Sequence, residues 1–213
     1  MTLLHRRQPA PRHDDFRLYK VYLREDFVYR CVYCTVHESE WGGFRHFQVE
    51  HFRPKVHFPK LLTEYSNLLY ACDVCNAFKG DDWPSDQPLT DRVGYLDPCE
   101  HDYDLYFVVA DDYRLLPMTP VASYMVERLH LNRNQLRKVR EKRAREETLH
   151  NQYIQLIDDT LTMMQTALCD LAVPAHARQS LEMALAMWRS EREAHLLAWA
   201  KRWDPPYNSG DYR

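Results

Sequence analysis

The chain has 213 residues, 45% of them hydrophobic and 28% charged, a composition that excludes a disordered chain and is typical of a globular protein. This length suits one large domain, or a compact domain with a substantial appendage. The net charge of −3 excludes a strongly basic chain, so any positive field toward nucleic acid must be local or supplied by a metal or a partner.

The N-terminus lacks the apolar stretch of a signal peptide, and no apolar run approaches the roughly 20 residues that span a bilayer. We therefore expect a cytoplasmic chain that does not enter a membrane. In a reducing compartment the 6 cysteines are interpreted first as metal ligands or redox groups, and only second as disulfides.

Residues 1–15 are rich in Pro, Arg and His without periodicity and are interpreted as a loose leader. The predicted main domain, residues 16–98, begins with a short helix at Phe16. Alternating apolar and polar residues predict one strand over 27–34 and a second over 44–52.

Residues 66–81 are predicted to begin as a loop and to become helical around Cys75, with the helix ending near Gly80, where a C-cap is expected. The Pro-, Asp- and Gly-rich stretch over 83–102 is predicted to be a surface connection. Residues 99–122 are predicted to form a connecting hairpin of two short strands. Residues 123–213 show three- and four-residue apolar spacing and are predicted to be helical, with a break near 131–134 and a last helix after Pro174. The fold class expected is α+β with a mostly helical C-terminal region.

A basic run lies in the first long predicted helix. It could follow a nucleic-acid backbone, but its interleaved glutamates favour a solvated helix face with i,i+4 ion pairs. The run comprises Arg137, Lys138, Arg140, Lys142, Arg143 and Arg145. Met and Trp residues further along the helices are interpreted as core or as a protein interface.

Two C-x-x-C pairs offer four thiols, Cys31 with Cys34 and Cys72 with Cys75. Four thiolates complete a closed tetrahedral site, so a structural zinc ion is predicted, with an iron–sulfur centre or a redox pair as alternatives. The 37 residues between the pairs exceed the roughly 15 to 20 of a simple zinc ribbon, which indicates an insertion. The other two cysteines, Cys99 and Cys169, are interpreted as packing residues.

The insertion contains the sequence VEHFRPK, residues 49–55, in which Glu50 precedes His51. A neutral imidazole can take a proton from water near pH 7, and a carboxylate can hold a divalent ion beside a phosphate. Two amides, Asn67 and Asn76, follow in the sequence. Taken alone, Glu50 and His51 before a proline could equally be an exposed surface acid and a histidine whose hydrogen bonds are satisfied within the fold, with no role in catalysis.

In this order the residues resemble the zinc-bearing branch of the HNH endonuclease family. The resemblance extends over Cys31 to Gly80 and consists of a C-x-x-C pair, an acid-His pair with a proline three residues on, Asn-Leu, and a second C-x-x-C pair followed by a polar residue and a lysine. The matching positions are Cys31, Cys34, Glu50, His51, Pro54, Asn67, Leu68, Cys72, Cys75, Asn76 and Lys79. Glu50 stands where Asp is frequent in that family, and Asn76 where many members have His.

The resemblance implies a ββα-metal core, the HNH or His-Me finger. His51 would be the general base, and Asn67 would hold the loop that orients it. Glu50 and Asn76 would bind one catalytic Mg²⁺ or Mn²⁺ in addition to the structural Zn²⁺. Phosphate contacts are expected from three cationic residues, namely Arg53, Lys55 and Lys79. Each of them could equally be an ordinary solvated surface charge. Two flanking histidines could be further ligands, namely His46 and His57.

The flank of this motif contains CNAFKGDDWP (75–84), GYLDP (94–98), a short predicted hairpin and VERLHLNRNQLRKVREKRARE (126–146). This order resembles, more diffusely, the HNH proteins of Septu-type and retron-associated anti-phage systems. This implies a nuclease acting on DNA, with RNA as an alternative, beside a partner ATPase. A rival hypothesis is a non-catalytic zinc module that binds nucleic acid or a protein, in which only the cysteines matter. A third hypothesis is an iron–sulfur or thiol redox protein, which would be coloured or would contain a redox-active cysteine pair.

Overall fold

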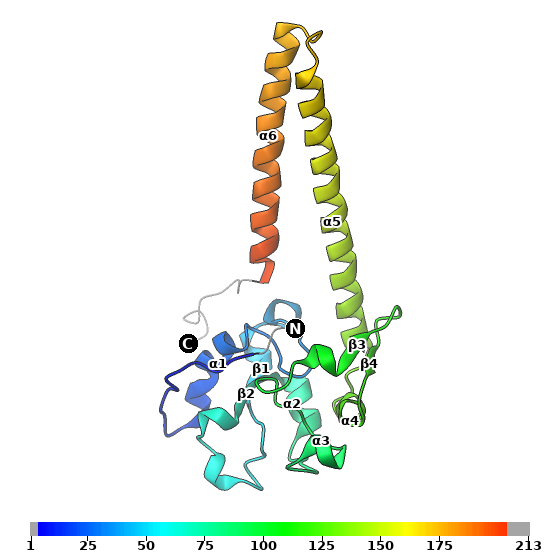
Figure 1. Ribbon diagram of the computed structural model, residues 1–213. Helices are drawn as coiled ribbons and strands as arrows, with labels where there is room; N and C mark the ends of the chain where they lie inside the picture. Colours follow the sequence, from blue (N-terminus) through cyan, green and yellow to red (C-terminus); the bar gives the residue numbers. More distant parts are fainter. Residues whose placement is uncertain (1–3, 204–213) are drawn as a thin grey trace. The chain divides into compact units, whose positions relative to one another are not determined.

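The structure is a computed structural model that describes residues 4–203 (Figure 1). The chain divides into two compact units, the first ending at Arg140 and the second beginning at Glu141. Within residues 4–203, none of the helices combines the length and the apolar character that crossing a membrane requires.

The first unit begins with a segment that contacts the main body through two arginines. Arg6 pairs with Asp97 at 3.2 Å, and Arg7 pairs with Asp26 at 2.7 Å. The predicted first helix is confirmed as the 3₁₀ turn η1 (Phe16–Tyr19) followed by α1 (Lys20–Asp26).

A two-stranded antiparallel sheet and the helix after it form the centre of the first unit. Strand β1 (Phe47–His51) confirms the second predicted strand and pairs with β2 (Leu68–Cys72), so that His51 lies opposite Leu68. Helix α2 (Asp73–Lys79) follows β2 directly and ends at Gly80, whose φ of +52° suits a residue without a Cβ. The prediction of a loop before Cys75 was wrong, because β2 occupies part of that segment. All five β2 residues are buried, so the strand shows no alternation of apolar and polar residues from which it could be predicted.

The strand predicted over 27–34 was also wrong, because the chain reverses direction there. Cys31 donates its N–H to the Val36 carbonyl at 2.9 Å, and Thr35 donates its N–H to the Cys31 carbonyl at 2.8 Å. These bonds close a tight turn that places Cys31 and Cys34 on the same side of the backbone.

The remaining elements of the first unit follow the predicted order, apart from the short helix α3, which was not predicted. Short helix α3 (Pro88–Asp91) is followed by β3 (Phe107–Val109) and β4 (Leu115–Pro117), which form the predicted antiparallel hairpin. Helix α4 (Pro120–Arg128) is separated from α5 (Asn134–Cys169) by the predicted break. Further 3₁₀ turns of this unit are η2 (Glu38–Glu40), η3 (Phe44–His46), η4 (Pro59–Leu61), η5 (Tyr65–Asn67) and η6 (Tyr103–Leu105), and the second unit ends with η7 (Lys201–Trp203).

The core of the first unit gathers around the β1–β2 hairpin, against which α1 and α2 both pack. Leu23, Phe47 and Tyr70 are fully buried in it. A buried ion pair crosses this core, with Arg24 Nη2 2.7 Å from Glu38 Oε2. The hairpin therefore packs against both helices, which fixes the side chains that it carries.

The second unit is a helical hairpin of the remainder of α5 and α6 (Ala175–Ala200), which run antiparallel (Figure 1). Ile157 and Leu185 are its buried apolar residues among those described, and Arg192 pairs with Asp158 at 2.6 Å. Two i,i+4 ion pairs, Lys142 with Glu146 and Arg145 with Glu141, favour the interpretation of the basic run as a solvated face. The described chain is thus mixed α and β, with a helical C-terminal region.

Candidate functional site

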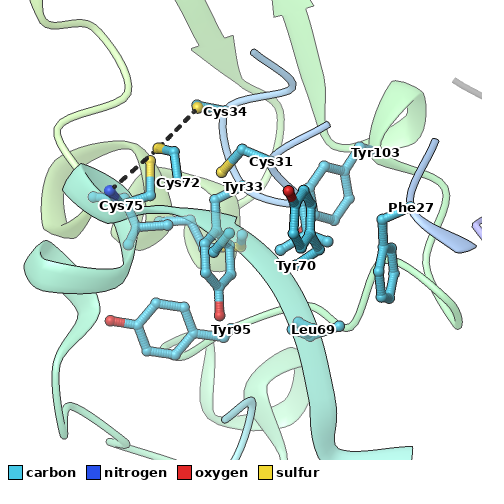
Figure 2. Close-up of a cluster of buried hydrophobic side chains, with 14 of the residues drawn as sticks. Phe27, Cys31, Tyr33, Cys34, Leu69, Tyr70, Cys72, Cys75, Tyr95 and Tyr103 are labelled. Carbon is cyan, nitrogen blue, oxygen red and sulfur yellow. Dashed lines mark hydrogen bonds between the residues drawn. The ribbon is translucent and has the colours of Figure 1, made fainter. Parts of the chain in front are cut away.

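The four cysteines of the two C-x-x-C pairs meet, and their sulfur atoms all lie within 4.8 Å of one another. Figure 2 shows them at one end of the buried cluster that contains Tyr33 and Tyr95. Cys31 and Cys34 come from the tight turn, Cys72 ends β2, and Cys75 lies in the first turn of α2. The pairing of a turn with a strand-to-helix junction explains why two short motifs far apart in sequence can form one site.

This cluster has the donor set and the spacing of a tetrahedral metal site. Four sulfurs, each about 2.3 Å from a central zinc ion, lie about 3.8 Å apart. The Sγ atoms of Cys34 and Cys72 are 3.8 Å apart. All four residues are buried, so the cluster could hold a zinc ion with no position open to substrate. Cys99 and Cys169 lie outside it, half-buried and exposed respectively.

A cavity of about 500 Å³ opens beside the hairpin, and Glu50, His51 and Asn76 all line it. β1 supplies the first two residues and α2 supplies the third. Because α2 follows β2 without a loop, the helix brings Asn76 to Gln48, the second residue of β1. The sequence-predicted acid, base and amide therefore share one cavity.

Glu50 is buried and held by two donors that reach the same oxygen atom. Lys79 Nζ lies 2.7 Å from Glu50 Oε1, and the Tyr33 hydroxyl donates to that oxygen at 3.2 Å. Burial raises the pKa of Glu50 above its ordinary value, while the Lys79 ammonium opposes this shift. The second carboxylate oxygen, Oε2, takes part in neither contact.

His51 is oriented by a backbone carbonyl and by an aromatic ring. Its Nε2 lies 3.0 Å from the carbonyl oxygen of Leu62, and its ring packs edge-on against Phe16 with centroids 4.8 Å apart. A carbonyl can only accept, so Nε2 carries the proton in the neutral ring and Nδ1 keeps its lone pair. Burial lowers the pKa of His51 below its ordinary value, which favours this neutral form.

Asn67 holds the loop between β1 and β2 with its side-chain amide. Its Oδ1 accepts from the Arg53 N–H at 2.9 Å, and its Nδ2 donates to the Arg53 carbonyl at 3.0 Å and to the Leu61 carbonyl at 3.4 Å. Leu61 precedes Leu62, whose carbonyl contacts His51. The amide of Asn67 is therefore one residue removed from the group that orients the imidazole.

Asn76 is partly exposed and donates from Nδ2 to Gln48 Oε1 at 2.5 Å. That bond fixes the amide so that its oxygen, Oδ1, is the atom left for a cation. Gln48 was not identified from the sequence, although its place two residues before Glu50 puts both side chains on one face of β1.

The predicted phosphate contacts occupy different surroundings. Lys55 lines the cavity with the acid and the base, whereas Arg53 lines a separate cavity of about 350 Å³ and lies 3.6 Å from Asp86. Lys79 is fully buried, so a direct phosphate contact would require it to leave Glu50. Arg17 also lines the first cavity and was not identified from the sequence, because it lies in a different element.

The two flanking histidines hydrogen-bond elsewhere. His46 Nδ1 lies 3.0 Å from Asp73 Oδ2, and His57 Nε2 lies 3.0 Å from the Asp81 carbonyl oxygen. Neither lines the cavity that holds Glu50.

A local sequence similarity connects this chain with one curated protein, the Septu protein PtuB of Bacillus thuringiensis. The two are 37% identical over 60 residues, which is 28% of this chain and 23% of that protein. The chain therefore matches less than a quarter of the length of this relative. No family model matches the chain, and no solved structure gives a significant match.

Proposed function

We propose that this protein is a metal-dependent endonuclease of the HNH type that hydrolyses phosphodiester bonds in DNA. The observation that carries the proposal is the shared cavity, in which His51 lies beside a buried acid and an amide and its Nδ1 has no hydrogen-bond partner among residues 4–203. A module that only binds zinc has no need of this combination at the surface of its hairpin.

In the proposed reaction His51 is the general base. Its Nδ1 accepts the proton of the attacking water, while Nε2 keeps its own proton on the Leu62 carbonyl. Desolvation keeps the imidazole neutral and able to accept a proton near pH 7. Asn67 holds the loop that carries Leu62 and so keeps the base in position.

Glu50 and Asn76 would hold a divalent cation, since carboxylate and amide oxygens are the donors that Mg²⁺ and Mn²⁺ prefer. When bound, such a cation supplies positive charge to the scissile phosphate and to the leaving oxygen. Lys55 and Arg17, which line the same cavity, add the local positive charge that a chain with a net charge of −3 otherwise lacks.

The four cysteines would hold Zn²⁺ as a structural ion, because a closed set of four thiolates leaves no position for substrate. Their role would be to fix the turn at 31–34 against β2 and α2. The turn carries Tyr33, which donates to Glu50, so the zinc ion would support the acid indirectly.

The setting proposed is bacterial defence against phage. The local similarity to a Septu protein supports it, together with the resemblance of the sequence to nucleases of such systems. A partner ATPase that delivers or controls the target belongs to the same proposal. RNA is the alternative substrate.

The test is cleavage of plasmid, single-stranded DNA and RNA with Mg²⁺ or Mn²⁺, by the wild type and by Glu50→Gln and Asn76→Ala. We expect metal-dependent cleavage of DNA by the wild type, loss with EDTA, and at least a hundredfold slower cleavage by Glu50→Gln. Preferred cleavage of RNA would change the substrate and keep the mechanism. If nucleic acid is bound equally by all three proteins and cut by none, with or without cellular partners, the non-catalytic zinc module is the better account.

A further inference from the structure

Arg133 lies in the turn between α4 and α5 and reaches the cysteine cluster from outside the two C-x-x-C motifs. Its Nη2 lies 3.5 Å from Cys75 Sγ, within hydrogen-bonding distance for sulfur. Its Nη1 donates to the Leu129 carbonyl at 3.2 Å, which fixes the guanidinium at the end of α4.

The guanidinium is half-buried between two aromatic rings. Its central carbon lies 5.6 Å from the centre of the Trp41 ring and 5.8 Å from that of Phe78. Its Nε is buried and has no hydrogen-bond partner among the described residues. Over residues 4–203 no carboxylate lies within ion-pair distance of Arg133. A partly desolvated cation needs a compensating charge, which the backbone carbonyls that accept from its Nη1 cannot supply. Among the described residues that Arg133 hydrogen-bonds, Cys75 is the one whose side chain can carry a negative charge.

We infer that Arg133 is the counter-cation of the four-cysteine metal site and stabilises its bound ion. Four thiolates around Zn²⁺ leave two net negative charges in a buried place. A guanidinium that donates to one of the sulfurs offsets part of this negative charge. The thiolates in turn supply the negative counter-charge for the Arg133 guanidinium. The inference rests on the zinc site of the proposed function and is independent of the nuclease activity.

This contact also joins the cysteine cluster to the turn between α4 and α5, within the first unit. Arg133 immediately precedes Asn134, the first residue of α5, and follows α4 by a few residues. Loss of the ion would therefore leave a half-buried cation without compensation at the α4–α5 turn.

The experiment compares zinc release from the full-length wild type, Arg133→Lys and Arg133→Met into a coloured chelator at neutral pH. Zinc ligands that lose a supporting hydrogen-bond partner commonly lose affinity about 10- to 100-fold, so we expect release from Arg133→Met to be about tenfold faster. Arg133→Lys keeps the positive charge, so its rate of zinc release should lie between those of the wild type and Arg133→Met. The matched control is Arg128→Met, near the end of α4, whose arginine pairs with Asp82 and not with a cysteine.

A second readout separates charge compensation from loosened packing. In the cobalt-substituted protein, loss of a cation beside sulfur raises the energy of the sulfur electrons and shifts the sulfur-to-cobalt absorption band to longer wavelength. We expect this shift in Arg133→Met and not in Arg128→Met. Release within twofold of the wild type with an unshifted band would overturn the inference while leaving the zinc site intact. A wild type that binds neither zinc nor cobalt would overturn the zinc site and the inference together.

Discussion

Glu50, the acid of the candidate site, is held by a buried ion pair with Lys79. Both side chains are at least 95% removed from solvent, and their charged atoms lie 2.7 Å apart. Lys79 also donates to the His51 carbonyl at 3.0 Å. One lysine therefore contacts both the side chain of the acid and the backbone of the base.

Removal of this lysine alone should destabilise the protein strongly. Lys79→Met leaves the Glu50 carboxylate buried without its partner, a change that typically costs about 3–5 kcal/mol. The double variant Glu50→Gln/Lys79→Met removes both charges and should recover most of that loss. Urea unfolding measures both effects. Equal stability of the single and double variants would show that the ion pair is not formed.

Asn67 offers a second test at the scale of one residue. Asn67→Ala removes three hydrogen bonds to the backbone of the loop and should lower the free energy of unfolding by about 1–3 kcal/mol. The neighbouring Ser66→Ala is the control, because Ser66 is exposed. If both variants unfold at the same urea concentration as the wild type, Asn67 does not hold the loop.

The Lys20 ammonium gives a dependence of stability on pH. Burial lowers the pKa of Lys20 from 10.5 to about 8 in the folded chain. Between these values the unfolded chain binds more protons, so this residue makes the protein more stable as the pH rises from 8 toward 10.5. Wild type should therefore gain stability relative to Lys20→Met between pH 7.5 and about 9.5 in urea unfolding. A difference that does not change with pH would contradict the shift.

At the scale of elements, the features that could be predicted from the sequence are those determined by neighbouring residues, and the features that depend on distant segments could not be. The cysteine cluster could be predicted because C-x-x-C spacing imposes its own geometry, and β1 could be predicted from its alternation. Strand β2 could not, since its residues are buried on both faces and carry no period. The contacts of His51 with Leu62 and of Glu50 with Tyr33 depend on how a long loop and a distant turn fold back, which no local pattern encodes.

Removal of the metal should act on the elements that it joins. A zinc ion held by the four cysteines would join the turn at 31–36 to β2 and α2, so we expect the amide protons of the turn to exchange faster after treatment with a chelator. Hydrogen exchange followed by mass spectrometry measures this. Exchange in the β3–β4 hairpin serves as the internal control. Unchanged protection of the turn would mean that the cluster does not hold a metal.

At the scale of the whole molecule, the two compact units are expected to have different stabilities. Among the described residues, the second unit buries few apolar side chains, with Ile157 1% exposed. Ile157→Ala should lower the free energy of unfolding of the second unit by about 2–5 kcal/mol. Part of the helical circular dichroism signal should then be lost at a lower temperature than in the wild type. Zinc content should stay unchanged. Loss of zinc in the same transition would show that the units unfold together.

The account as a whole depends on His51 acting as the base of a nuclease. The most direct measurement is the rate of plasmid cleavage with Mg²⁺ or Mn²⁺ for the wild type, His51→Ala and His57→Ala, all with zinc bound. His57 lies in the loop that follows β1, contacts the Asp81 carbonyl and lies outside the cavity. We predict that His57→Ala cleaves at nearly the wild-type rate and that His51→Ala is slower by at least two orders of magnitude, on the scale of a lost general base. Cleavage by His51→Ala at the wild-type rate would contradict the central claim.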